Sequence, residues 1–239
     1  MSYLKTLSRI AGVLTATLLL AGPAAANVNK SIKISDGEQA GSQSTVNGSI
    51  TVGNGATLTG DVQTVNGAIR IGDSVQANDV STVNGSIRAG DGLVATAVES
   101  VNGTIRLGSG SQVAGDVSVV NGKIRISAAS TVGQDVSNVN GELMIEGAQI
   151  GGDVSTVSGD VTLTGGSTVQ GDLIIEKPSG WSWGRRKEPR IVIGPNSQVL
   201  GTIDARREIE LYISDTASVG GVTGEASMDD AVRFSGERP

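Results

Sequence analysis

The sequence predicts an all-β fold, a single-stranded parallel β-helix (solenoid) with turns of 18 or 19 residues. The first observation is a tripeptide, Val-Asn-Gly or a near copy, that occurs seven times with this step. The copies begin at Val46, Val65, Val83, Val101, Val120, Val139 and Val157. A period this short holds neither a helix pair nor a propeller blade. Each repeat is therefore expected to form one turn whose apolar side chains stack on the next.

Composition and local patterning support the same fold. The chain has 35 glycines and only 5 prolines, which suits short strands joined by tight corners. Ile124 and Ile126 alternate with Arg125, as in a strand with one buried side. Equivalent apolar pairs recur at Ile69/Ile71, Ile105/Leu107, Leu143/Ile145 and Val161/Leu163. The pattern predicts inward aliphatic columns, each buried side chain contributing roughly 1.5–3 kcal/mol.

Residues 1–26 have the pattern of a bacterial export signal. Lys5 and Arg9 precede an apolar run at residues 10–20, and three alanines at 24–26 form a cleavage site. The mature chain is expected to begin at Asn27 and to be periplasmic, at the cell surface or secreted, with a retained signal anchor as the alternative. Cleavage leaves 16 basic against 24 acidic residues, a net charge of −8 that disfavours nucleic acid as a partner.

The predicted solenoid covers residues 27–225, and residues 226–239 form a C-terminal cap or tail. The repeat begins at Val28, directly after the signal, and continues through Ile191/Ile193 and Ile209/Leu211. Val232 and Phe234 are expected to cover the last turn. Such thin caps expose strand edges, which favours end-to-end self-association.

Polar residues also form columns in the alignment. The asparagines of the tripeptide are interpreted as a structural ladder, at a corner where Asn and Gly accept positive φ. Arginines occupy one outward column, at Arg70, Arg88, Arg106 and Arg125. Aspartates occupy another, at Asp61, Asp79, Asp116, Asp135, Asp153 and Asp172, with Ala97 as a gap. Each charged column is expected to find counter-charges or to remain solvated, the functional alternatives being a polyanion along the arginines or a cation between aspartates.

The sequence argues against several chemistries. It has no cysteine and no histidine, which removes thiolate chemistry, Cys/His zinc sites and the Ser-His-Asp triad. The glycine-rich repeat of calcium-binding β-rolls is missing, so no cofactor and no metal site are predicted. A third column, Thr45, Thr64, Thr82, Ser100 and Thr156, suggests an ice-binding face. Val119 and Asn138 interrupt it, which argues against that function.

One insertion breaks the repeat. The step from Ile175 to Ile191 is 16 positions, where Val157 to Val161 uses four. The insertion spans residues 176–190 and contains both tryptophans beside a basic cluster. The candidate binding residues are Trp181, Trp183, Arg185, Arg186 and Lys187. Exposed Trp with Arg is typical of binding hot spots and membrane interfaces; in the alternative, the tryptophans cover a sheet.

Two segments resemble known families. Ile-Gly-Pro-Asn-Ser-Gln-Val-Leu-Gly-Thr-Ile at 193–203, with Val-Gly-Gly-Val at 219–222, resembles the bactofilins, polymer-forming bacterial cytoskeletal β-helices. Thr-Val-Asn-Gly-Ser-Ile-Arg at 82–88 resembles an adhesin family of exported bacterial β-solenoids. These resemblances imply a right-handed solenoid and polymer formation. A six-residue rhythm from Val65 to Val113 instead resembles left-handed hexapeptide acyltransferases, whose catalytic histidine this chain lacks.

The predicted function is that of an exported, non-enzymatic structural or adhesin-like solenoid that associates with itself or with a cell-envelope component. One alternative is a module that binds a glycan or polysaccharide through the insertion. Another is a polysaccharide-acting β-helix enzyme of the lyase type, which uses aspartate and arginine.

Overall fold

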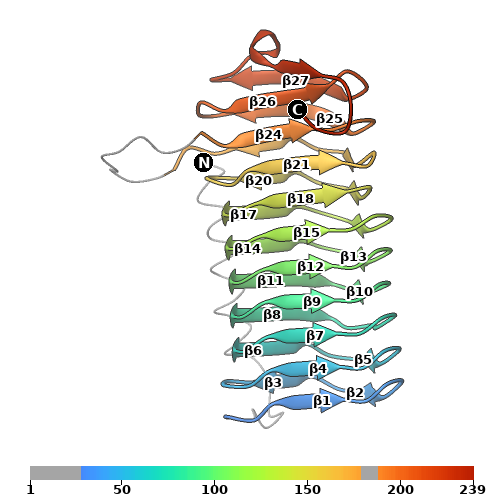
Figure 1. The fold of residues 1–239 in the computed structure, drawn as a ribbon. Helices are drawn as coiled ribbons and strands as arrows, with labels where there is room; N and C mark the ends of the chain where they lie inside the picture. The colour runs from blue at the N-terminus through green and yellow to red at the C-terminus, as the bar shows by residue number, and fades with distance from the viewer. Residues whose placement is uncertain (1–27, 179–187) are drawn as a thin grey trace.

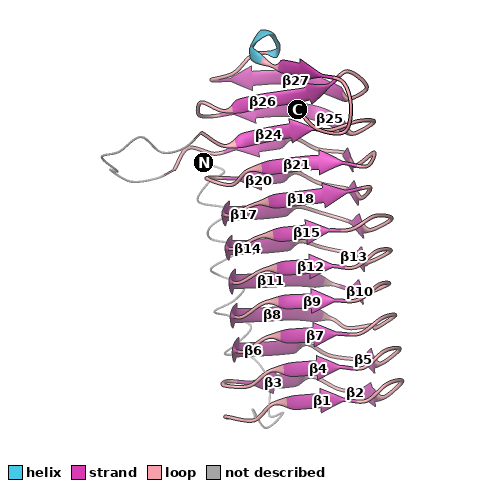
Figure 2. Cartoon of the chain, in the orientation of Figure 1, coloured by secondary structure: helices cyan, strands magenta, loops and turns pink. Residues whose placement is uncertain are grey.

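The computed structural model describes residues 28–178 and 188–239, which form one continuous stack of parallel strands (Figure 1). Besides the 3-10 turn η1 (Met228–Asp230), every regular element in these residues is a strand (Figure 2). The predicted all-β parallel solenoid is therefore confirmed. The signal segment proposed at residues 1–26 lies outside the described residues.

Most turns contribute a strand to each of three walls. The first, called here the arginine wall, is an eleven-stranded sheet with one strand at each level. Its strands, in stacking order, are β1 (Ile32–Ile34), β4 (Ile50–Val52), β7 (Ile69–Ile71), β9 (Ile87–Ala89), β12 (Ile105–Leu107), β15 (Ile124–Ile126), β18 (Leu143–Glu146), β21 (Val161–Thr164), β24 (Arg190–Ile193), β26 (Glu210–Ser214) and β28 (Val232–Phe234). Ten steps of about 4.8 Å make this wall roughly 48 Å tall.

Of the other two walls, one is built from short strands and the other from long strands. The short-strand wall comprises β2 (Gln39–Ala40), β5 (Thr57–Leu58), β10 (Val94–Ala95), β13 (Gln112–Val113), β16 (Thr131–Val132), β19 (Gln149–Ile150) and β22 (Thr168–Val169). The long-strand wall comprises β3 (Gln43–Thr45), β6 (Val62–Asn66), β8 (Asp79–Asn84), β11 (Ala97–Asn102), β14 (Val117–Asn121), β17 (Val136–Asn140), β20 (Val154–Thr156) and β23 (Leu173–Ile175). The strand β25 (Gln198–Ala205) runs through both walls and pairs with β27 (Ser218–Gly224).

The register follows the sequence period. Ile105 pairs with Ile87 on one side and with Ile124 on the other, so equivalent residues of successive repeats are direct neighbours. The inward side chains of all three walls consequently meet in one continuous aliphatic core. Ile105 and Ile124 are fully buried, whereas Arg106 is exposed, as predicted.

The C-terminal end differs in part from the prediction. The strand β28 adds to β26, so strand pairing runs beyond residue 225 to Phe234. The Phe234 side chain is buried, as expected, but Val232 is 53% exposed. Val232 therefore does not cover the last turn: its register partner is Tyr212, an outward position between the buried Leu211 and Ile213.

The Asn-Gly corner joins the long-strand wall to the arginine wall, and its glycines are needed for a different reason from the one predicted. Of the tripeptide glycines, only Gly141 has a positive φ. A Cβ atom on Gly67, Gly85 or Gly103 would instead overlap the carbonyl oxygen of the glycine one turn before it. Close approach of successive turns, and not a left-handed backbone, therefore excludes side chains here.

Positive φ occurs at another corner, between the arginine wall and the short-strand wall. Gly92 and Gly110 adopt it there, and so do the non-glycine residues Ser74 and Ala129. Glycine is favoured at this corner because an L side chain is strained in that backbone conformation, even where space is free.

The two requirements for glycine give a stability prediction. Gly103→Ala is expected to lower the free energy of unfolding by roughly 2–3 kcal/mol, because the new methyl group would force neighbouring turns apart. Gly41→Ala is the matched control, since nothing lies within 4 Å of a Cβ built there. It should change stability by less than about 0.5 kcal/mol. Equal losses in chemical denaturation would contradict the proposed overlap.

Candidate functional site

The insertion leaves the stack between β23 and β24. The predicted binding residues Trp181, Trp183, Arg185, Arg186 and Lys187 lie outside the described residues. The flanks of the insertion are described, and polar contacts hold both of them to the stack.

On the first flank, the Glu176 carboxylate accepts a hydrogen bond from Arg206 Nη1 at 2.7 Å, and Lys177 Nζ pairs with Glu225 at 3.0 Å. Arg206 also donates through Nε to Asp204 at 2.7 Å. On the second flank, the backbone N–H of Arg190 donates to Asp160 Oδ1 at 2.9 Å, and the Arg190 guanidinium lies 4.6 Å from the centre of the Tyr212 ring. The start and the end of the insertion are therefore fixed to the solenoid.

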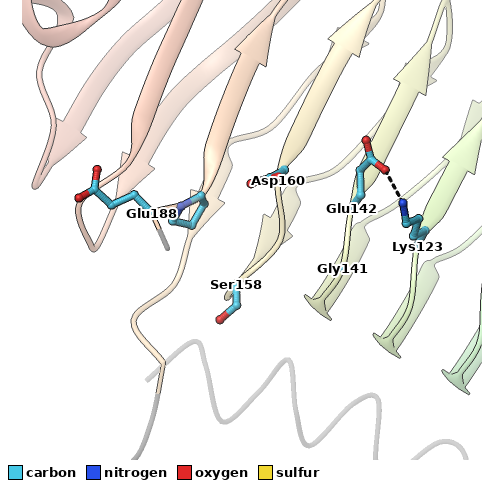
Figure 3. Close-up of a pocket in the computed structure, with 7 residues that line it drawn as sticks. Lys123, Gly141, Glu142, Ser158, Asp160 and Glu188 are labelled. Atoms are coloured by element: carbon cyan, nitrogen blue, oxygen red, sulfur yellow. Dashed lines mark hydrogen bonds and ion pairs between the residues drawn. The ribbon is translucent and has the colours of Figure 1, made fainter. Parts of the chain in front are cut away.

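A hollow of about 350 Å³ lies beside the second flank (Figure 3). It is lined by Lys123, Gly141, Glu142, Ser158, Asp160, Glu188 and Pro189. The register of β15, β18 and β21 stacks Lys123, Glu142 and Asp160 on successive turns, one residue before each inward aliphatic. The hollow is therefore formed by three turns of the solenoid and the end of the insertion.

The hollow is polar and mainly acidic. Lys123 Nζ pairs with Glu142 at 3.0 Å, as the dashed line in Figure 3 shows. The carboxylate of Glu188 and the hydroxyl of Ser158 supply further oxygen atoms. These groups suit hydrogen bonding to hydroxylated ligands such as sugars. Within the described residues, no group of three or more His, Cys, Asp or Glu residues is arranged to hold a metal ion.

The sequence did not single out this hollow. A signal was present, because the column containing Thr104, Lys123, Glu142 and Asp160 changes from neutral to charged side chains next to the insertion. These residues follow the tripeptide directly, so the same alignment of the repeats contains the column.

The asparagine column forms the predicted ladder. Each side-chain amide donates through Nδ2 to Oδ1 of the asparagine one turn earlier, at 2.7–3.0 Å. The ladder runs through Asn29, Asn47, Asn66, Asn84, Asn102, Asn121 and Asn140. Its role is structural, as the sequence indicated.

The Ser/Thr column faces inward, so it forms no ice-binding surface. Thr64, Thr82 and Ser100 are buried, and their hydroxyls donate to the carbonyl oxygens of Gly48, Gly67 and Gly85. The donor–acceptor distances are 2.9, 3.1 and 3.2 Å. These hydroxyls therefore satisfy the backbone carbonyls of the Asn-Gly corner.

Asn138 is an exception within this column. It is 2% exposed, and neither its Nδ2 nor its Oδ1 has a hydrogen-bond partner among the described residues. Its neighbour one turn earlier is Val119, which needs no partner. A buried amide without partners costs free energy, so Asn138 marks a weak point of the corner.

The carboxylates of the aspartate column accept backbone hydrogen bonds, an arrangement that the sequence did not suggest. One carboxylate oxygen of Asp116, Asp135 and Asp153 accepts a hydrogen bond from the backbone N–H of the aspartate in the next turn, at 2.8–3.0 Å. Backbone N–H groups can thus stabilise such a column of carboxylates, in addition to counter-charges and solvation. A second ladder of this kind, absent from the sequence predictions, links Asp36, Asn54, Asp73 and Asp91 at the positive-φ corner.

Glu99 lies beside the gap in the aspartate column. Burial, and after it the charges of Asp79 and Asp116, raise the pKa of Glu99 to about 7. The pKa of Asp79 is also raised, first by burial and then by Asp61. A partly protonated Glu99 lowers the negative charge at this level of the stack.

The arginine column is exposed on the outer side of the arginine wall. Arg70, Arg88, Arg106 and Arg125 are successive Cα partners on β7, β9, β12 and β15. None of the four forms an ion pair with a described residue. This column therefore differs from the asparagine and aspartate columns, which are satisfied within the stack.

Comparison with known proteins gives no family assignment. No family model, no curated protein and no solved structure matches the chain. The resemblances to bactofilins and to adhesin solenoids therefore remain predictions from the sequence. None of the helical segments in the described residues has the length and hydropathy to cross a membrane.

The unpaired amide of Asn138 gives a second stability prediction. Asn138→Thr is expected to raise the free energy of unfolding by about 1–2 kcal/mol, because threonine restores the hydroxyl found at Thr82 and removes two unpaired polar atoms. Asn140→Thr is the matched control, since Asn140 Nδ2 donates to Asn121 at 2.9 Å. That change should lower stability by about 1 kcal/mol. A loss in both variants on urea denaturation would show that Asn138 is satisfied.

Proposed function

We propose that this protein is an exported, non-enzymatic structural or adhesin-like solenoid that associates end to end at the bacterial cell envelope. The observation that carries the proposal is the open edge of the stack at β1. Among the described residues, β1 and β3 are terminal strands of their sheets, with no strand paired on their outer sides. Such edges are templates for pairing with another chain.

The backbone geometry of β1 shows which groups are free to pair. The Ile32 N–H donates to Ser49 at 2.9 Å, and the Ile34 carbonyl accepts from Gly53 at 3.0 Å. Alternate residues of a parallel strand bond to opposite sides, so the N–H and C=O of Lys33 point out of the stack. A second copy that supplies a strand edge satisfies these groups and extends the solenoid.

This geometry predicts a variant that blocks association. Lys33→Pro removes the outward N–H but no bond to β4, so single particles should replace chains in electron microscopy and light scattering. Lys33→Gln loses the same charge and keeps the N–H, so its chains should persist. Thermal unfolding should be similar in both variants. Wild-type protein that remains monomeric across salt and concentration would exclude self-association through this end.

A second candidate function is binding of a glycan or another envelope component through the insertion. It is favoured by the polar hollow beside the insertion and by the contacts that fix both flanks. The tryptophans and basic residues of the insertion would supply stacking and charge, and the hollow would supply hydrogen-bonding oxygens.

Replacing both tryptophans tests whether the insertion binds an envelope component. Trp181→Ala with Trp183→Ala is expected to weaken binding to isolated envelope polysaccharide and to leave thermal unfolding nearly unchanged, because the described core is built from side chains of the repeat. Poor quenching of the wild-type indoles by acrylamide, together with early unfolding of the variant, would show that the tryptophans cover a sheet. Turnover of an acidic polysaccharide by the purified chain would contradict the non-enzymatic proposal.

A further inference from the structure

The arginine column is a regular cationic array. Register pairing stacks Arg70, Arg88, Arg106 and Arg125 at about 4.8 Å intervals along a parallel sheet. All four side chains are exposed. Thr51 precedes the four arginines, with Lys33 one level before it, and Met144 follows them, so the arginines occupy four consecutive levels.

The charges around the column do not neutralise it. Asp73 and Asp91 lie at the adjoining corner, but neither forms an ion pair with an arginine of the column, and one oxygen of each accepts a backbone N–H from the next turn, at 2.9 and 2.8 Å. Lys123 lies next to the column and pairs with Glu142. The four guanidiniums therefore keep their donors available and repel one another, so the column contributes no stability that would explain it.

The geometry points to a binding site for a linear anionic polysaccharide along Arg70, Arg88, Arg106 and Arg125, with its chain parallel to the solenoid axis. A guanidinium binds a carboxylate through two parallel hydrogen bonds, so the arginines can hold those sugar carboxylates that face the wall. The interval between levels is comparable to the length of one sugar unit in an extended chain. Four linked sites act together, and binding is thus stronger than at any single arginine.

The surroundings favour a polysaccharide over other polyanions. Single-stranded nucleic acid requires aromatic side chains for base stacking, and the sequence has none from residue 28 to residue 180. A membrane surface requires apolar or aromatic side chains that insert beside the cations, and this column is only one residue wide. The site is independent of the end-to-end association and of the insertion.

The test uses the full chain and polygalacturonate as the probe, with binding measured by calorimetry over a range of salt concentrations. Arg88→Gln with Arg106→Gln should weaken binding about tenfold or more and reduce the salt dependence by roughly one unit per arginine removed. Arg88→Lys with Arg106→Lys keeps the charge and loses the two-point contact, so an intermediate loss is expected.

A charge-matched control is Arg233→Gln with Arg238→Gln, which removes two arginines away from the column and should leave binding nearly unchanged. Fully methyl-esterified polygalacturonate should not bind, because it lacks the carboxylates. The proposal is overturned if both glutamine pairs lose affinity equally, or if the esterified polymer binds as well. Tighter binding to single-stranded DNA or to anionic vesicles than to polygalacturonate would also overturn it.

Discussion

Parallel backbone hydrogen bonding between successive turns is the constraint on which the rest of the structure depends. It fixes the distance between equivalent residues at about 4.8 Å, so each side chain meets a copy, or near copy, of itself above and below. A residue type is acceptable at a position only if it can contact itself. Aliphatic side chains do so by packing, and Ile87, Ile105 and Ile124 form such a column. At the Asn-Gly corner, the turns are so close that only glycine fits.

The same constraint separates the polar columns by their hydrogen-bonding groups. An amide both donates and accepts, so asparagines form a ladder from Asn29 to Asn140 without outside partners. A carboxylate only accepts, and the aspartates therefore use the backbone N–H of the next turn. A guanidinium only donates, and no described residue forms an ion pair with Arg88 or Arg106. The arginine column is thus the one whose hydrogen bonding the described residues do not complete, which is why it points to a ligand.

Much of the fold was predictable because a short period and a strict alternation leave few alternatives. The inward pairs such as Ile105/Leu107 and the asparagine ladder were found from alignment alone. The direction of Thr64 and Thr82 was not, because a hydroxyl next to an apolar valine favours the opposite assignment: Thr64 and Thr82 are buried, whereas Val65 and Val83 are half-buried. The role of Gly103 depends on how closely two turns approach, a distance that no sequence pattern contains. The hollow at Lys123 and Glu142 could not be predicted either, because it also depends on where the insertion rejoins the stack, and the repeat does not specify that position.

The position of the insertion follows from the same corner. Thr156 is the last hydroxyl of the inward column, because its partner one turn later is Ile175. The asparagine ladder has already ended at Asn140, and Ser158 and Lys177 occupy the next two levels of that column. Both sets of hydrogen bonds that close the corner therefore stop before residue 178. A corner without them can open without leaving buried polar groups unpaired, so this level of the solenoid accommodates additional residues that an earlier level would not.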